Sequence, residues 1–273
     1  MIPSLSHTNT ILKEMPTYGS CPLLIMTDNY NQYVIKHGKG HNPPTEILNE
    51  FICTFLLKQW EIYTPEFGLI HTDSDLITSY NSAKHKVRFY KVPSFGSKHV
   101  IDAIELSAFG LALDSKHDFN KLSDPLIFCH TALFDTWVEN LDRHGGNYNL
   151  LMNQTQGKFN FIPIDHAFVF NQLEYKELIP AQYSPSSNMH LLDSDVGIFI
   201  RLYMTIDSDF IASEEEYFYF CVEKCKQSIN LILNWLTREY NLHVNLFTPL
   251  TDYLFDIKRC GQVFEEYKYR LKE

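Results

Sequence analysis

The chain has 273 residues, of which 45% are apolar and 14% are aromatic, so it can form one large domain or two small lobes and is not intrinsically disordered. Its formal net charge of -10 argues against a protein that binds duplex nucleic acid, because such proteins need a large basic surface. The N-terminus has no basic region followed by a long apolar run, and no stretch of about eighteen apolar residues occurs. We therefore expect a cytoplasmic protein without a signal peptide, without a role at a membrane and without direct DNA binding.

The first hundred residues are predicted to be mostly sheet with one helix. Leu23–Thr27 and Gln32–Lys36 are rich in β-formers and flank polar turn residues, which predicts a hairpin whose last residue is Lys36. Helical periodicity extends over Thr45–Tyr63, and Glu50 lies in this helix. Further strands are expected at Phe67–Ile70, Leu76–Ile77 and Val87–Val92.

The middle of the chain combines an apolar helix, a polar loop and a hairpin. Pro125–Glu139 is a strongly apolar helix that leads directly into the polar segment Asn140–Asn147. Two short strands, Tyr148–Met152 and Phe159–Ile164, then form a second hairpin, and Asp165 follows its second strand. This order places the polar loop and Asp165 at neighbouring strand ends.

The last part of the chain has a helical pattern from Glu214 onward, with aromatic and leucine side chains that we expect in a core. Together these elements predict an α+β fold. Residues 1–100 are expected to form a small β-rich lobe, and residues 101–273 a larger, mainly helical lobe.

Three polar residues of the middle segment fit the chemistry of phosphoryl transfer. In ATP-dependent transfer an Asp accepts the proton of the attacking hydroxyl, and an Asn and a second Asp bind magnesium. Taken singly, Asp142 and Asp165 also fit caps of turns or helices, and Asn147 fits a turn with positive φ. The joint pattern favours Asp142 as the catalytic base and Asn147 and Asp165 as the magnesium ligands.

The first lobe offers residues for the nucleotide. Lys36, at a strand end, can reach ATP phosphates as a point charge, and Glu50 on the next helix can pair with it. For each residue alone, an exposed charge is the commoner interpretation. The backbone amides of Gly19 and Ser20, just before the first strand, can cover the phosphates as a short nest. We predict that these four residues bind ATP.

Other residues keep two interpretations. Arg143 either positions Asp142 or contacts a phosphate. His144 and His166 are either catalytic or support the loop by packing and hydrogen bonds. The segment 184–188 is either a mobile segment with phosphorylation sites or an ordinary polar loop.

Taken together, these residues resemble the HipA-like serine/threonine kinases, and more specifically the compact members that lack the usual N-terminal subdomain. The resemblance covers roughly residues 18–170, and its central block is highly specific. The segments that carry it are Gly19–Pro22, Tyr33–Lys36, Asn49–Glu50, Phe95–Lys98, Phe134–Asn147 and Ile164–His166.

This resemblance implies a bilobal protein-kinase-like fold, ATP and Mg²⁺ as cofactors, and phosphorylation of a protein serine or threonine. It also implies a link to bacterial toxin–antitoxin systems and an antitoxin-like partner protein. However, the toxins of the family usually carry an N-terminal subdomain that helps to bind the antitoxin, and Lys36 occurs too early in the chain for one. Two alternatives stay open, namely a kinase of a metabolite or lipid and a non-catalytic nucleotide-binding partner protein.

Overall fold

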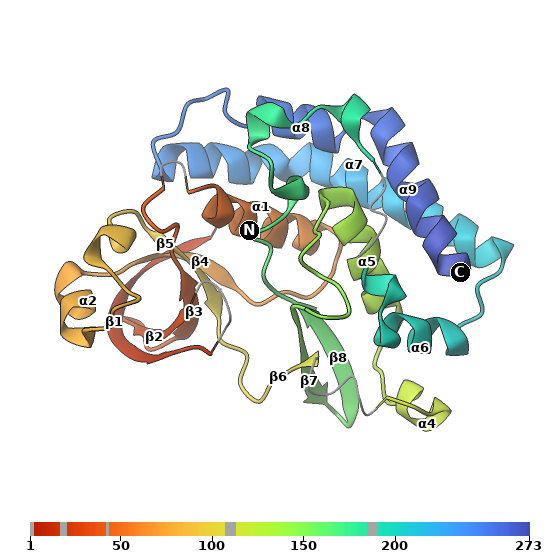
Figure 1. The fold of residues 1–273 in the computed structure, drawn as a ribbon, viewed down its shortest axis with the longest axis horizontal. Helices are drawn as coiled ribbons and strands as arrows, with labels where there is room; N and C mark the ends of the chain where they lie inside the picture. Colours follow the sequence, from red (N-terminus) through yellow and green to blue (C-terminus); the bar gives the residue numbers. More distant parts are fainter. Residues whose placement is uncertain (1–2, 17–20, 42–43, 107–112, 185–189) are drawn as a thin grey trace. The chain divides into compact units, whose positions relative to one another are not determined.

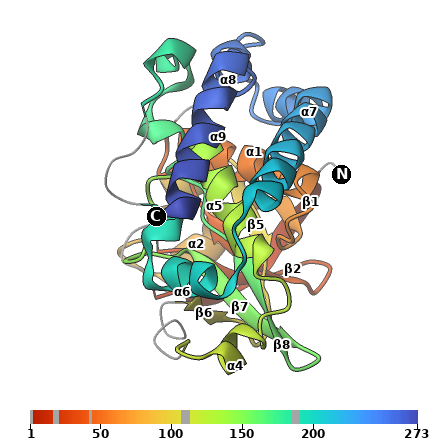
Figure 2. The same cartoon turned by 90° about the vertical axis from the view of Figure 1, so that its right-hand side faces the viewer.

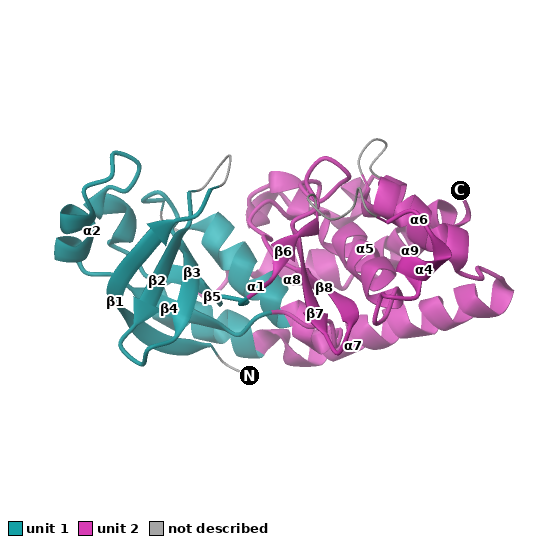
Figure 3. Ribbon diagram, turned by 90° about the horizontal axis from the view of Figure 1, so that it is seen from below, with its two compact units in different colours: residues 1–55, 65–101, 231–243 teal, residues 56–64, 102–230, 244–273 magenta. Residues whose placement is uncertain are grey.

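The chain folds into two compact units, drawn in different colours in Figure 3. The structure is a computed structural model that describes residues 3–16, 21–41, 44–106, 113–184 and 190–273. As predicted, the fold is α+β, with a β-rich N-terminal part and a helical C-terminal part. The lobe boundary at residue 100 stays a prediction. Unit 1 comprises residues 1–55, 65–101 and 231–243, and unit 2 comprises residues 56–64, 102–230 and 244–273.

Unit 1 contains a closed β-barrel with the strand order β1-β2-β3-β5-β4 (Figure 1). A parallel pairing of β1 with β4 closes the barrel, and the other pairings are antiparallel. The predicted hairpin is confirmed as β2 and β3, whereas the sequence pattern predicts neither β1 nor β5. Gly96 in β5 is needed because a Cβ there would lie 2.4 Å from Cγ1 of Ile70 in β4. The strands are β1 (Ser4–Glu14), β2 (Leu23–Thr27), β3 (Gln32–Lys36), β4 (Phe67–His71) and β5 (Ser94–Lys98).

The predicted first helix is confirmed as α1 (Thr45–Gln59), although it ends before Tyr63. Residues 47–57 are all buried, so α1 is an interior helix and not an amphipathic one on the surface. Glu50 lies within this buried stretch with 1% of its surface exposed. Just beyond the helix Glu61 has a φ of 60°, a left-handed conformation that prevents further helical turns.

Aromatic side chains from distant parts of the sequence form the core of unit 1. The ring of Phe51 in α1 lies 4.9 Å from that of Phe95 in β5 and 5.4 Å from that of Trp235. Trp235 belongs to α7 (Ser208–Glu239), and the following Tyr240 donates its hydroxyl hydrogen bond to Pro93 O at 2.9 Å. The core of unit 1 therefore needs residues from the C-terminal third of the chain.

The weak strand predicted at Leu76–Ile77 is wrong, because both residues lie in α2 (Ser74–Tyr80). The helix begins after Asp73, whose carbonyl accepts a hydrogen bond from Ile77 N at 3.3 Å. Ile77 is buried and contributes to the hydrophobic cluster formed with the barrel. A run of two apolar residues is too short to distinguish a strand from a helix by its periodicity.

The strand predicted at Val87–Val92 is also wrong, because Val87–Tyr90 forms the 3₁₀ helix η1. The tertiary structure overrides a composition that favours a strand. Tyr90 is buried in the same hydrophobic cluster as Ile77, and its hydroxyl lies 2.7 Å from Nδ1 of the buried His85. β5, which follows η1, pairs with both β3 and β4 in the barrel.

The second predicted hairpin is confirmed in unit 2 as β7 and β8. Its strands extend further toward the turn than predicted, as far as Thr155 and Lys158. Gln156 and Gly157 form the turn with φ values of 53° and 78°, as a tight hairpin requires. The sheet has the order β6-β7-β8 and consists of β6 (Ile104–Glu105), β7 (Leu150–Thr155) and β8 (Lys158–Pro163).

Helices form the rest of unit 2. The apolar helix predicted at Pro125–Glu139 is confirmed as α5, which packs against α9 (Figure 2). The predicted helical pattern from Glu214 onward is confirmed as α7, α8 and α9. None of the helices in the described part of the chain is long and apolar enough to cross a bilayer. The helices here are α4 (Lys116–Phe119), α5 (Leu126–Val138), α6 (Asp195–Tyr203), α8 (Thr248–Leu254) and α9 (Ile257–Lys272), with 3₁₀ helices η3 (Phe170–Gln172), η4 (Tyr175–Glu177), η5 (Pro180–Gln182) and η6 (Leu191–Asp193).

Candidate active site

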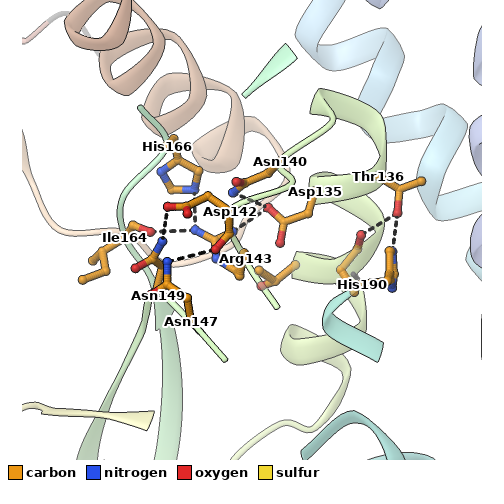
Figure 4. Close-up of polar contacts among 12 residues, drawn as sticks. Asp135, Thr136, Asn140, Asp142, Arg143, Asn147, Asn149, Ile164, His166 and His190 are labelled. Carbon is orange, nitrogen blue, oxygen red and sulfur yellow. Dashed lines mark hydrogen bonds and ion pairs between the residues drawn. The ribbon is translucent and has the colours of Figure 1, made fainter. Parts of the chain in front are cut away.

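The candidate catalytic loop connects α5 to β7 (Figure 4). Two backbone hydrogen bonds close it, from His144 N to Asn147 O at 3.0 Å and from Asn147 N to His144 O at 2.9 Å. The exposed Gly145 and Gly146 form the turn between them. Gly146 N also donates to Nδ1 of His144 at 3.1 Å. Of the two roles that the sequence leaves open for His144, the structure shows the supporting one.

Two asparagines fix the position of Asp142 in this loop (Figure 4). Asn149 Nδ2 donates to the carboxylate atom Oδ2 of Asp142 at 3.1 Å. Asn147 Nδ2 donates to the backbone oxygen of Asp142 at 3.0 Å. Asp142 itself is only half-buried. Its carboxylate therefore has a defined orientation and retains access to solvent.

Asp165 lies just after β8 with a φ of 61°, a left-handed conformation that is uncommon for a residue other than glycine. The preceding residue is linked twice to the catalytic loop: Ile164 N donates to Asn149 O at 3.0 Å, and Arg143 Nη2 donates to Ile164 O at 2.6 Å. The following residue, His166, is buried and has its Nε2 at 3.0 Å from Arg143 Nη2. The residues on both sides of Asp165 are thus bonded to the candidate catalytic loop.

Arg143 is the centre of these hydrogen bonds and is almost fully buried, with 1% of its surface exposed. Its Nη1 forms an ion pair with Asp135 Oδ1 at 2.5 Å, and Asn140 Nδ2 donates to the same oxygen at 3.1 Å. Burial raises the pKa of Asp135, whereas the charge of Arg143 and the hydrogen bonds from Arg143 and Asn140 oppose this rise. The guanidinium is bonded to Asp135 and Ile164 inside the protein. Arg143 therefore positions the loop and does not present its charge to a phosphate.

Asn149 and the role of Asp135 are not among the predictions from the sequence. A signal exists for each of them. Asn149 lies two positions after Asn147 next to a strand, where alternate residues share a side. Asp135 is the one carboxylate of the mainly apolar helix α5, and such a residue is seldom buried unless it is paired.

The predicted nucleotide-binding residues Lys36 and Glu50 form an ion pair in unit 1. Lys36 Nζ lies 2.6 Å from Glu50 Oε1, and the two side chains are 14% and 2% exposed. Lys36 is the last residue of β3, and Glu50 lies in the buried middle of α1. The pairing expected from the sequence is present, while a role in ATP binding stays a prediction. Gly19 and Ser20 lie outside the described residues, as do residues 185–188 of the predicted polar segment.

The described residues include no cluster of three or more His, Cys, Asp or Glu side chains that could hold a metal ion by themselves. Mg²⁺ usually binds one or two protein oxygen ligands together with phosphate oxygens and water. Asn147 and Asp165 offer such oxygen atoms. Since Nδ2 of Asn147 donates to the loop, its Oδ1 is the atom suited to a cation. By residue type the two are suited to Mg²⁺ that arrives with a nucleotide, and their role as ligands stays a prediction.

Comparisons with known proteins identify the family of the chain. A family model described as HipA-like kinase matches residues 9–183, more than half of the chain. The chain therefore belongs to the HipA-like kinase family, and this membership supports phosphotransferase activity. A search of curated proteins found no significant match.

The structure is similar in fold to a solved kinase. The Helicobacter pylori proinflammatory kinase CtkA matches with a TM-score of 0.56 and 12% identity, over 99% of this chain and 98% of that chain. At this identity the likeness shows the fold alone. The open conformation of CtTel1 matches at 13% identity over 96% of this chain and 12% of that chain. Its TM-score of 0.36 is too low to indicate a shared fold.

Proposed function

We propose that this protein is an ATP- and Mg²⁺-dependent kinase that phosphorylates serine or threonine side chains of a protein substrate. The observation that carries the proposal is the hydrogen-bonded loop that orients Asp142 and Asn147 and is bonded to Ile164, the residue before Asp165. Family membership supports a phosphotransferase in general. The identities of Asp142, Asn147 and Asp165 support dependence on ATP and Mg²⁺, because they match the base and the metal ligands of ATP-dependent kinases.

Asp142 would act as the catalytic residue that accepts the proton of the attacking hydroxyl. Asn149 holds one carboxylate oxygen of Asp142 and so restricts the rotation of the group. Arg143 holds the loop itself through Asp135 and Ile164. A base that is oriented in advance loses little freedom when the acceptor arrives, which lowers the barrier of the transfer step.

Lys36 would bind the ATP phosphates as a positive charge, and Glu50 would keep its ammonium group in place. Asn147 and Asp165 would hold Mg²⁺, which neutralises phosphate charge when it is bound with ATP. Gly19 and Ser20 stay candidates for backbone contacts to the phosphates. Each role is one that the residue type and its position permit.

A protein acceptor is favoured over a lipid because a net charge of -10 is repelled by anionic lipid surfaces. The family adds support for serine or threonine as the acceptor. An antitoxin-like partner follows only from the family resemblance, and a cytoplasmic location only from the sequence pattern; both stay predictions.

The proposal is tested by phosphate transfer from labelled ATP, with and without Mg²⁺, to the protein itself and to a panel of proteins. Asp142→Asn should lower transfer at least about hundredfold, because a general base contributes roughly 10² to 10⁴. Asp209→Asn is a matched control, since Asp209 is an exposed carboxylate in the first turn of α7. It should leave transfer unchanged.

Three results would contradict the proposal. Full transfer by Asp142→Asn would remove Asp142 from catalysis. ATP binding without transfer by the wild type would instead favour a non-catalytic nucleotide-binding partner protein. Label that appears only in small molecules or lipids would replace the protein acceptor by another acceptor class.

A further inference from the structure

Glu139 joins α5 to the catalytic loop. Its φ is 49°, which is uncommon for a residue other than glycine and persists only where the surroundings fix it. Its backbone N–H points back toward the carbonyl oxygens of Asp135 and Thr136. Because Asp142 follows after only two intervening residues, the direction of the chain at Glu139 determines where the candidate base lies.

Two residues near the C-terminus hold the side chain of Glu139. Tyr253 in α8 donates its hydroxyl to Oε2 of Glu139, and Arg259 Nη2 in α9 lies 3.7 Å from the same oxygen. Arg259 is fully buried, with 0% of its surface exposed, and its Nη2 also donates to Trp137 O at 2.5 Å in the last turn of α5. A buried guanidinium needs such partners, and here they lie at the end of α5.

The rings of two tyrosines lie against the guanidinium of Arg259. Its Cζ lies 3.9 Å from the ring centroid of Tyr253 and 4.9 Å from that of Tyr183. Both are cation–π contacts. The hydroxyl groups differ, since Tyr253 donates to Glu139 whereas Tyr183 donates to Glu266 Oε2 at 2.6 Å. The two tyrosines therefore form a natural matched pair for an experiment.

Glu139 also contacts the segment that follows Asp165. Asn171 N donates to the backbone oxygen of Glu139 at 3.3 Å. Glu139 thus links the start of the catalytic loop to the segment downstream of the candidate magnesium ligand. Tyr253 and Arg259 fix this link from α8 and α9, outside the residues 9–183 that the family model matches.

We propose that Glu139, Tyr253 and Arg259, here called the Glu139 clasp, are positioning residues for phosphoryl transfer. The clasp holds the α5 end in the left-handed conformation that places Asp142, and it holds the segment after Asp165 through Asn171. α8 and α9 therefore contribute to the geometry of the active centre through Tyr253 and Arg259. This inference rests on the proposed kinase function for its catalytic part.

The test compares Tyr253→Phe with Tyr183→Phe in the full-length chain. Each variant loses one buried hydroxyl and keeps its ring against Arg259, but only the first loses a bond to Glu139. Tyr253→Phe should lower kcat about tenfold while KM for ATP changes less than about threefold, because the nucleotide contacts are unchanged. Tyr183→Phe should leave kcat within about twofold.

Amide hydrogen exchange provides a second readout that does not depend on activity. Tyr253→Phe should speed exchange in peptides covering residues 138–147 and 169–173, and Tyr183→Phe should not. Equal effects of the two variants on exchange would overturn the clasp, as would an unchanged kcat in an active Tyr253→Phe protein. If the wild type transfers no phosphate, the proposed function fails, and the exchange comparison still decides whether the clasp positions the loop.

Discussion

The two units position the polar residues of their candidate sites by different backbone structures. In unit 1, Lys36 and Glu50 come from a regular strand and a regular buried helix, and an ion pair of 2.6 Å joins them. In unit 2, Glu139, Asn149 and Asp165 have left-handed backbones with φ values of 49°, 46° and 61°. Such conformations are uncommon for residues other than glycine, although Asn and Asp tolerate them better than Glu, and surrounding contacts stabilise them. Placement of the charge in unit 1 therefore depends on regular packing, whereas placement in unit 2 depends on a polar network.

Breaking the network of unit 2 should have the largest effect on stability. Arg143→Met leaves the buried carboxylate of Asp135 without its ion-pair partner, so the free energy of unfolding should fall by about 3–5 kcal/mol. Urea unfolding of the variant measures this loss. The double variant Asp135→Leu/Arg143→Met should recover part of it, because no unpaired charge then stays buried. A loss below about 1 kcal/mol in the single variant would show that the pair does not support the loop.

Breaking the ion pair of unit 1 should have a smaller effect on stability. Lys36→Met should lower the free energy of unfolding by about 1.5–3 kcal/mol, because Glu50 loses a charged partner in a buried position. It should also raise KM for ATP. Lys98→Met is the matched control, since Lys98 pairs with Glu66 at 2.8 Å with side chains 39% and 65% exposed. That change should stay within about 0.5 kcal/mol in chemical denaturation, and equal losses for both lysines would refute the contrast.

Acid should weaken both units in the same direction, with the smallest of the three effects. Burial lowers the pKa of His190 in unit 2 to about 3, and burial lowers the pKa of His37 in unit 1 to about 4. Each pKa is below its unfolded value of 6.5, so the stability that each contributes is complete above pH 6.5 and is lost as the pH falls. At pH 5.5 each histidine should cost about 1.4 kcal/mol.

The structure gives a local reason for the neutral state of His190. Leu192 N donates to its Nδ1 at 3.2 Å, and Thr136 Oγ1, which donates to Ala132 O, lies 2.7 Å from its Nε2. A proton on Nδ1 would meet the N–H of Leu192. Thermal unfolding between pH 7.5 and 5.5 measures the effect. His190→Gln should flatten the pH dependence, whereas His243→Gln, at an exposed position, should not. An unchanged slope in the first variant would exclude His190 as the cause.

The parts of the fold and site that local sequence determines could be predicted. The hairpin ending at Lys36, the apolar helix α5 and the loop with Asp142 and Asn147 each depend on residues close together in the chain. Gly145 and Gly146 form the turn of this loop, and Asp142 and Asn147 lie on either side of it. Local propensity and turn chemistry are sufficient for such elements.

The remaining parts depend on tertiary contacts that local sequence patterns do not encode. β1 pairs in parallel with β4, which is separated from it by two strands and a helix, and no local pattern reveals this pairing. Tyr90 is in a 3₁₀ helix because of its burial and its bond with His85. Arg143 points inward because it forms an ion pair with Asp135 in the preceding helix α5. Sequence periodicity carries no information on such partners, so both roles of Arg143 stay open until the structure is known.

The dependence of unit 1 on α7 has a consequence for biosynthesis. Phe51 in α1 packs against Trp235, and Tyr240 binds Pro93 O, so the aromatic core of the N-terminal unit is incomplete until residue 240 has left the ribosome. At about 5–20 residues per second, synthesis beyond residue 101 up to that point takes on the order of ten to thirty seconds. During this time the nascent barrel exposes apolar surface that its own later sequence must cover. Unit 1 thus begins to emerge first but is completed only after residues 102–230 of unit 2 have been synthesised, and chaperone assistance should matter most during this interval.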